Sequence, residues 1–135
     1  MILSFRRPSG DPVLEAFTDR THAWLDDARR IAEQAGFPFV TRTGGGVLLA
    51  SDVLIDLHGH DASWDRLDVG VLETWLHDHG LGEAVPLVLA DVAVFTHFLA
   101  LLGRIPDDVA NAAHDRVEEM LLEGSFDSRR RGPAN

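Results

Sequence analysis

Three side chains that can bind metal alternate along one short segment in the middle of the chain. They are Asp56, His58 and His60, separated by Leu57 and Gly59. On an extended strand, alternate side chains lie on the same face, so these three would project together. Carboxylate and imidazole are ligands that suit zinc and manganese. We therefore expect a divalent metal site here, and the sequence suggests no other cofactor.

The Asp-x-His-x-His pattern resembles the metal motif on the first strand of amidohydrolase and PHP-type barrels. The resemblance covers residues 56–60 alone, and those barrels need a chain much longer than 135 residues. It therefore implies a set of metal ligands but no membership of those families. Further ligands would come from Asp61, Asp65, His77 or His79. The alternative is that the two histidines of the motif end a strand and enter a turn without binding metal.

Other reactive side chains are scarce. The chain has no Cys and no Tyr, and all 12 of its basic residues are Arg. These absences exclude a thiol nucleophile, a Schiff-base amine, a phosphate-binding lysine and a phenolic acid. Ser51 and Ser63 have histidines nearby, but neither lies in the Gly-x-Ser-x-Gly pattern of a serine nucleophile. We expect no catalytic residues, and a binding protein is better supported than an enzyme.

The chain is strongly acidic. Its 22 Asp and Glu residues give a formal net charge of −10, and up to Ser128 there are 9 arginines against 22 acids, which gives −13. Such a body disfavours nucleic acid, because binding to it requires neutralisation of phosphates. It would attract a basic protein partner. The alternative is that the acids only keep the protein soluble.

One tryptophan lies among these acids. Trp64 is flanked by Asp61 and Asp65, and Asp68 follows shortly after. An exposed tryptophan surrounded by carboxylates would make an anchor for a partner protein. We therefore expect Asp61, Trp64, Asp65 and Asp68 to bind the partner. The alternative is that Trp64 folds back as a lid on the sheet described below.

Four helices are expected to position these residues. The first begins with Asp11 as N-cap and Pro12, shows apolar residues at steps of three and four, and ends at Gly36. The third carries few charges on any face, so we expect it to be central and buried and not to span a membrane. The second to fourth helices are expected from Trp64 or Asp68 to His79, from Pro86 to Leu102, and from Asp107 to Glu123.

Strands are expected between the first two helices and at the start of the chain. They cover residues 2–5, 37–43, 47–50 and 53–58, with the glycines at 44–46 forming a hairpin turn. The alternative for the last strand is a short helix over 52–58 capped by Ser51. The expected fold is α+β, a small antiparallel sheet of three to four strands packed against about four helices. It forms a single domain over 1–128, and 129–135 is a basic flexible tail.

Two functions follow from these patterns. The first is a small acidic, non-catalytic protein-binding module, such as an inhibitor, immunity or accessory protein, that acts by charge complementarity. The second is a small metal-binding or metal-dependent hydrolytic protein that uses residues 56–60. The chain lacks Cys and shows no secretory signal at its start, so we expect a cytoplasmic protein. Its all-Arg usage is typical of a GC-rich bacterial genome. The oligomeric state and the identity of the partner stay open.

Overall fold

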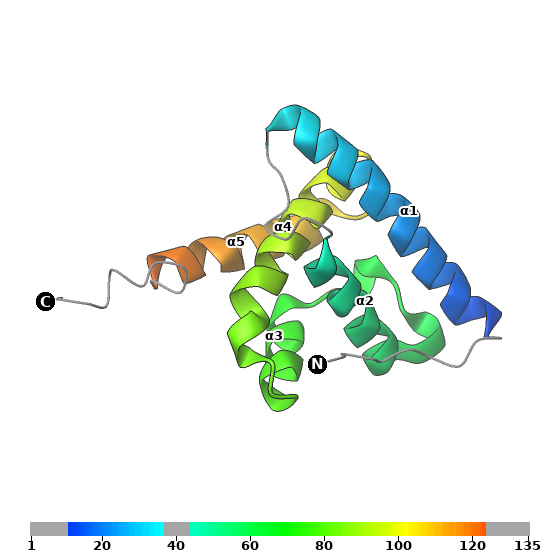
Figure 1. Ribbon diagram of the computed structural model, residues 1–135, viewed down its shortest axis with the longest axis horizontal. Helices are drawn as coiled ribbons and strands as arrows, with labels where there is room; N and C mark the ends of the chain where they lie inside the picture. Colours follow the sequence, from blue (N-terminus) through cyan, green and yellow to red (C-terminus); the bar gives the residue numbers. More distant parts are fainter. Residues whose placement is uncertain (1–10, 37–43, 124–135) are drawn as a thin grey trace, which may run out of the picture.

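The described part of the chain has no regular structure other than helix. The computed structural model describes residues 11–36 and 44–123. Within these ranges 85% of the residues lie in helices and there are no strands, so the fold is an all-α bundle (Figure 1). The expected α+β fold with an antiparallel sheet is therefore wrong. The strands expected at 2–5 and 37–43 and the tail at 129–135 lie outside the described residues.

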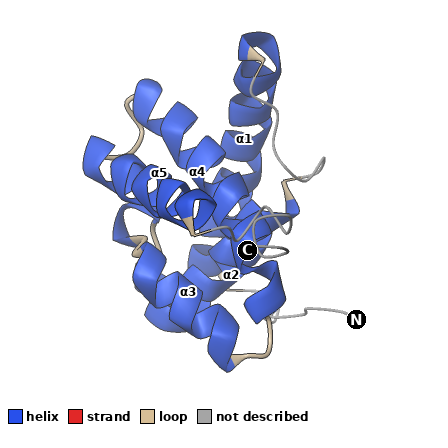
Figure 2. Cartoon of the chain, turned by 90° about the vertical axis from the view of Figure 1, so that its left-hand side faces the viewer, coloured by secondary structure: helices blue, strands red, loops and turns tan. Residues whose placement is uncertain are grey.

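Five α-helices and three short 3-10 helices follow one another along residues 11–36 and 44–123. The four expected helices are present close to their predicted ends, and one further helix, α2, was not predicted over its full length. Figure 2 shows the same helices from the side, with α5 close to both α4 and α3. Helix α4 contacts α1, α2, α3 and α5. The order is α1 (Pro12–Ala35), α2 (Gly45–His58), η1 (Gly59–Asp61), η2 (Trp64–Arg66), α3 (Val69–Asp78), η3 (Gly82–Ala84), α4 (Val85–Leu101) and α5 (Asp107–Leu122).

Helix α1 begins and ends as the sequence predicts. Asp11 Oδ1 accepts hydrogen bonds from the N–H groups of Val13 (3.1 Å) and Leu14 (3.3 Å). Gly36 ends the helix with φ of 82°, in the left-handed region that glycine favours. One face of α1 is buried against α2 and α4. Its buried residues are Phe17, Thr21, Leu25, Ala28 and Ala32.

Helix α2 replaces the hairpin turn and the two strands that were expected between residues 44 and 58. It packs against α1, α3 and α4, so apolar residues occupy several of its sides. A helix buried in this way lacks the one-sided periodicity that identifies an amphipathic helix. The run Val53-Leu54-Ile55 is rich in β-branched residues and is fully buried, a pattern that fits a buried strand equally well. The alternative helix over 52–58 was right about the type of element but not about its start.

The start of α2 is capped by a residue of another helix. Gly44 occupies the N-cap position with φ of 73° and offers no side chain to the first free N–H groups. Asp91 of α4 is fully buried, and its Oδ2 accepts a hydrogen bond from the Gly46 N–H at 3.1 Å. A Cβ atom on residue 46 would lie 2.9 Å from Asp91 Cβ and 3.0 Å from Val88 Cα. Glycine at this position therefore lets α2 and α4 approach closely.

Two arginine–carboxylate pairs fix helices relative to one another. Arg116 of α5 donates from Nε and Nη2 to both carboxylate oxygens of Glu73 in α3, each at 2.9 Å. Arg104 donates to Asp27 of α1 at 2.9 Å, and its guanidinium lies 5.6 Å from the centre of the Trp24 ring. The hydrogen bonds from Arg116 hold the pKa of Glu73 below its ordinary value, and Arg104 acts on the pKa of Asp27 in the same way.

The region around α4 is the most apolar stretch of the described chain. Residues 82–101 are long and apolar enough to cross a membrane by length and composition, with a mean hydropathy of 2.0. In the fold, 56% of this apolar window is buried against the other helices. A core helix meets the same criteria of length and composition, so these criteria alone do not indicate a membrane span.

Candidate functional site

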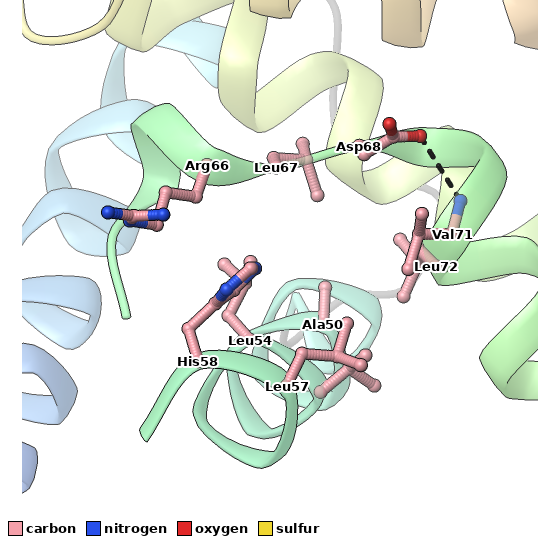
Figure 3. A pocket seen from close by; sticks show the side chains of 10 residues that line it. Ala50, Leu54, Leu57, His58, Arg66, Leu67, Asp68, Val71 and Leu72 are labelled. Atoms are coloured by element: carbon pink, nitrogen blue, oxygen red, sulfur yellow. Dashed lines mark hydrogen bonds between the residues drawn. The ribbon is translucent and has the colours of Figure 1, made fainter. Parts of the chain in front are cut away.

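A groove lies between α2 and the segment that runs from η2 into α3. Its deep part is a cavity of about 240 Å³ (Figure 3). This is smaller than the roughly 300–1,000 Å³ of typical small-molecule sites, so it fits side chains of a partner better than a whole ligand. We call this cavity, together with the shallow depression that continues it, the α2–α3 groove. The lining of the cavity is mostly aliphatic: Ala50, Val53, Leu54, Leu57, Leu67, Val71 and Leu72, with His58, Arg66 and Asp68.

The cavity opens into a wide, shallow depression along α3. Leu57 and Val71 line both parts, and 42% and 45% of their surfaces are exposed. Aliphatic side chains exposed together in a hollow are a common feature of surfaces that bind another protein. The depression is lined by Leu57, Asp68, Gly70, Val71, Thr74, Trp75 and Asp78.

Contacts of α3 hold the two walls of the groove in place. Asp68 caps α3, since its Oδ1 accepts a hydrogen bond from the Val71 N–H at 3.2 Å (Figure 3). Trp75 Nε1 donates to Asp56 Oδ2 of α2 at 2.9 Å, which ties the middle of α3 to the second wall. His79 stacks on Trp75, with ring centres 3.6 Å apart and an angle of 11° between the planes. The bond between Trp75 and Asp56 therefore links the two walls of the hollow directly.

Opposite charges lie at the two ends of the groove. Figure 3 shows His58 and Arg66 at one end of the cavity and Asp68 at the other. Asp78 lies farther along the shallow depression and is exposed. A partner segment that crosses the groove would therefore meet carboxylates along α3 and cationic or proton-donating groups at the opposite end.

The structure does not bring the three expected metal ligands together. Asp56 accepts the hydrogen bond from Trp75, and His58 lines the α2–α3 groove. His60 turns to α1, where its Nε2 donates to Asp11 Oδ2 at 2.7 Å, and this bond lowers the pKa of Asp11. Asp56 and His58 are two residues apart on α2 and so do not face one another, and His60 lies beyond the helix in η1. No group of three or more His, Asp or Glu side chains among the described residues is arranged to hold a metal ion.

The expected partner-binding residues divide into one buried and three exposed. Trp64 is only 2% exposed; its Nε1 donates to Thr21 Oγ1 at 2.9 Å and its ring contacts Phe95 edge to face. It is a core residue and offers no anchor to a partner. Asp61, Asp65 and Asp68 are exposed, and of these Asp68 lines the groove.

Three residues that shape the groove were not expected from the sequence. Leu57 was placed in a strand, Val71 on the buried face of a helix, and Arg66 drew no attention. The missing information is that α2 is a helix, because only then does Leu57 reach the surface next to α3. Arg66 had one signal in the sequence, since it is the single positive residue in the acidic stretch 61–68.

No protein-family model matches the chain, and neither a curated protein nor a solved structure is significantly similar to it.

Proposed function

We propose that this chain is a small acidic helical protein-binding module whose α2–α3 groove holds a basic and apolar segment of a partner protein. The observation that carries the proposal is the pair of exposed aliphatic side chains, Leu57 and Val71, in a hollow bordered by Asp68 and Asp78. Covering the exposed part of each aliphatic side chain contributes about 1 kcal/mol.

The hollow supports the proposal more strongly than the overall charge does. Exposed acids also lie on α1 and α5, for example Asp19, Glu33 and Asp115, so negative charge by itself does not single out one face. The groove differs because it combines apolar surface with neighbouring carboxylates. Leucine side chains of a partner would fill the cavity, and its arginines or lysines would lie beside Asp68 and Asp78.

The proposal is tested with a synthetic pentapeptide, Arg-Arg-Leu-Arg-Leu, labelled with fluorescein at its amino end. Its fluorescence anisotropy is measured with increasing protein concentration. Leu57→Asp places a charge in the hollow and should weaken binding about tenfold. Leu101→Asp is the matched control, because Leu101 is 68% exposed on α4 and does not line the groove.

The charge part of the proposal needs a second pair of variants. Asp78→Arg reverses a charge in the groove, and a cation at this position suits the end of α3. Asp115→Arg makes the same change on the exposed surface of α5. We expect only Asp78→Arg to weaken binding of the peptide. Equal effects of the groove and control variants, or no binding to the native protein, would contradict the proposal.

A further inference from the structure

Arg66 differs from the other arginines of the described chain. Four of them form ion pairs with carboxylates, and Arg20 lies over the rings of Phe17 and Trp24. Arg66 is the one described arginine whose guanidinium has neither a carboxylate nor a ring as partner. The four paired arginines are Arg29, Arg30, Arg104 and Arg116.

The chain has 22 acids, yet the guanidinium of Arg66 has no carboxylate partner among the described residues. It lies at the end of an apolar groove, where it is available to a carboxylate of a partner. His58 lies at the same end of the cavity (Figure 3), and its ring makes no hydrogen bond to a described residue. Both side chains can donate hydrogen bonds, and guanidinium presents two parallel N–H groups that match the two oxygens of a carboxylate.

The chain itself limits the groove at this end. Helix α2 ends at His58 and η2 ends at Arg66, so residues 59–65 connect the two walls. The other end opens into the shallow depression near Trp75 and Asp78. A partner segment that enters from the open end therefore runs toward a covalent connection between the walls. A segment that stops there avoids the connection and brings a terminal group beside Arg66.

We propose that His58 and Arg66 bind the C-terminal carboxylate of the partner protein, an inference that rests on the proposed function of the groove. The last side chain of the partner is apolar and occupies the cavity beside Leu54, Leu57 and Leu72. The preceding residues are basic and follow the depression past Asp68 and Asp78. The site thus recognises a protein end of stated chemistry: basic residues followed by an apolar residue with a free carboxylate.

The test compares the pentapeptide Arg-Arg-Leu-Arg-Leu as a free acid with the same peptide as a C-terminal amide. If only long-range charge mattered, the amide would bind more tightly, because it is more positive and the protein is acidic. We expect the opposite order, with the free acid binding about fivefold more tightly. Arg66→Gln should abolish this difference. Arg29→Gln, which removes a partly buried arginine of α1 that lies outside the groove, should leave it unchanged.

A third peptide separates the two sources of a carboxylate. It has Glu inserted before the last leucine, so all three arginines are kept. It ends in an amide, and its carboxylate therefore belongs to a side chain. Equal binding of this peptide and the free acid would overturn the assignment to a chain end. Equal affinity of the native protein for the free acid and the amide would overturn it too. So would an Arg66→Gln variant that loses the same affinity for both peptides.

Failure of this inference and failure of the proposed function give different results. If the groove binds peptides but ignores their ends, Leu57→Asp weakens the acid and the amide equally, and only the inference fails. If Leu57→Asp changes the affinity of neither the free acid nor the amide, the groove is not the binding surface, and the proposed function fails as well. Arg66→Lys is a second variant that keeps the charge; it should retain part of the preference for the free acid, and its circular dichroism shows whether the helices are intact.

Discussion

Asp91 caps a helix to which it does not belong. Its carboxylate lies in the apolar centre of the fold and accepts the Gly46 N–H at the start of α2. Burial of a charged group is unfavourable unless the group is hydrogen-bonded, and free N–H groups at a helix start carry partial positive charge. The buried carboxylate thus obtains a donor and the helix start obtains an acceptor, although the two residues are 45 positions apart in the sequence. In the sequence, Asp91 is an acid within an apolar helix, and this position alone does not indicate which N–H group it meets.

Loss of this cap should lower stability measurably. We expect Asp91→Ala to reduce the free energy of unfolding by about 1–3 kcal/mol, because a buried N–H loses its acceptor. The measurement is urea unfolding followed by circular dichroism. Asp115→Ala makes the same substitution on the exposed surface of α5 and should change little. Similar losses in the two variants would mean that the carboxylate of Asp91 does not stabilise α2.

At the scale of elements, the sequence predicts a helix well where one face is apolar and both ends carry signals. For α1, Asp11, Pro12 and Gly36 mark the ends and the apolar positions mark the face. For α2 these signals are absent, because its N-cap is a glycine and its acceptor comes from α4. Its side chains are buried on several sides, so spacing does not distinguish helix from strand. The groove depends on α2, and so it was missed together with the helix.

The link between α3 and α5 should depend on pH. The pKa of Glu73 in the folded protein lies below its ordinary value of 4.5, because Arg116 binds the ionised form. The pair therefore stabilises the fold above that value, and this contribution is lost as the pH falls through the lowered pKa. Glu73→Gln should cost about 1–2 kcal/mol at neutral pH. The gap to the native protein should narrow as the pH falls from about 5 to about 3.

Urea unfolding at several pH values measures this gap. The matched control is Glu33→Gln, since Glu33 is exposed on α1 and its side chain has no partner among the described residues. The gap for this control should be small and should not change with pH. A gap for Glu73→Gln that stays constant on acidification would show that the ionised form of Glu73 contributes nothing to stability.

At the scale of the whole molecule, 22 acids outnumber 12 arginines, and most described arginines are already paired with carboxylates. Arg116 joins α5 to α3, and Arg104 joins the loop between α4 and α5 to α1. Two of the arginines thus connect separate parts of the fold, while many carboxylates face solvent. A basic partner would feel attraction over much of the surface and find apolar contact in the groove.

This division of roles predicts how salt affects binding. Raising the salt concentration from about 50 mM to about 500 mM shortens the range of electrostatic attraction severalfold. The affinity of Arg-Arg-Leu-Arg-Leu should therefore fall with salt, and Asp78→Arg should make the fall less steep. Anisotropy titrations at four salt concentrations give both slopes. Affinity that does not change with salt would mean that the carboxylates take no part in binding.

The contact between Asp91 and Gly46 also affects the order in which parts of the fold can be completed. The acceptor is made 45 residues after its donor, so closing this long loop must precede a complete start of α2. While the chain is being synthesised, α2 therefore lacks its contacts with α4 until α4 has been made. We expect a chain interrupted before residue 85 to lack α4 and with it the acceptor for the Gly46 N–H, so α2 would begin without its cap.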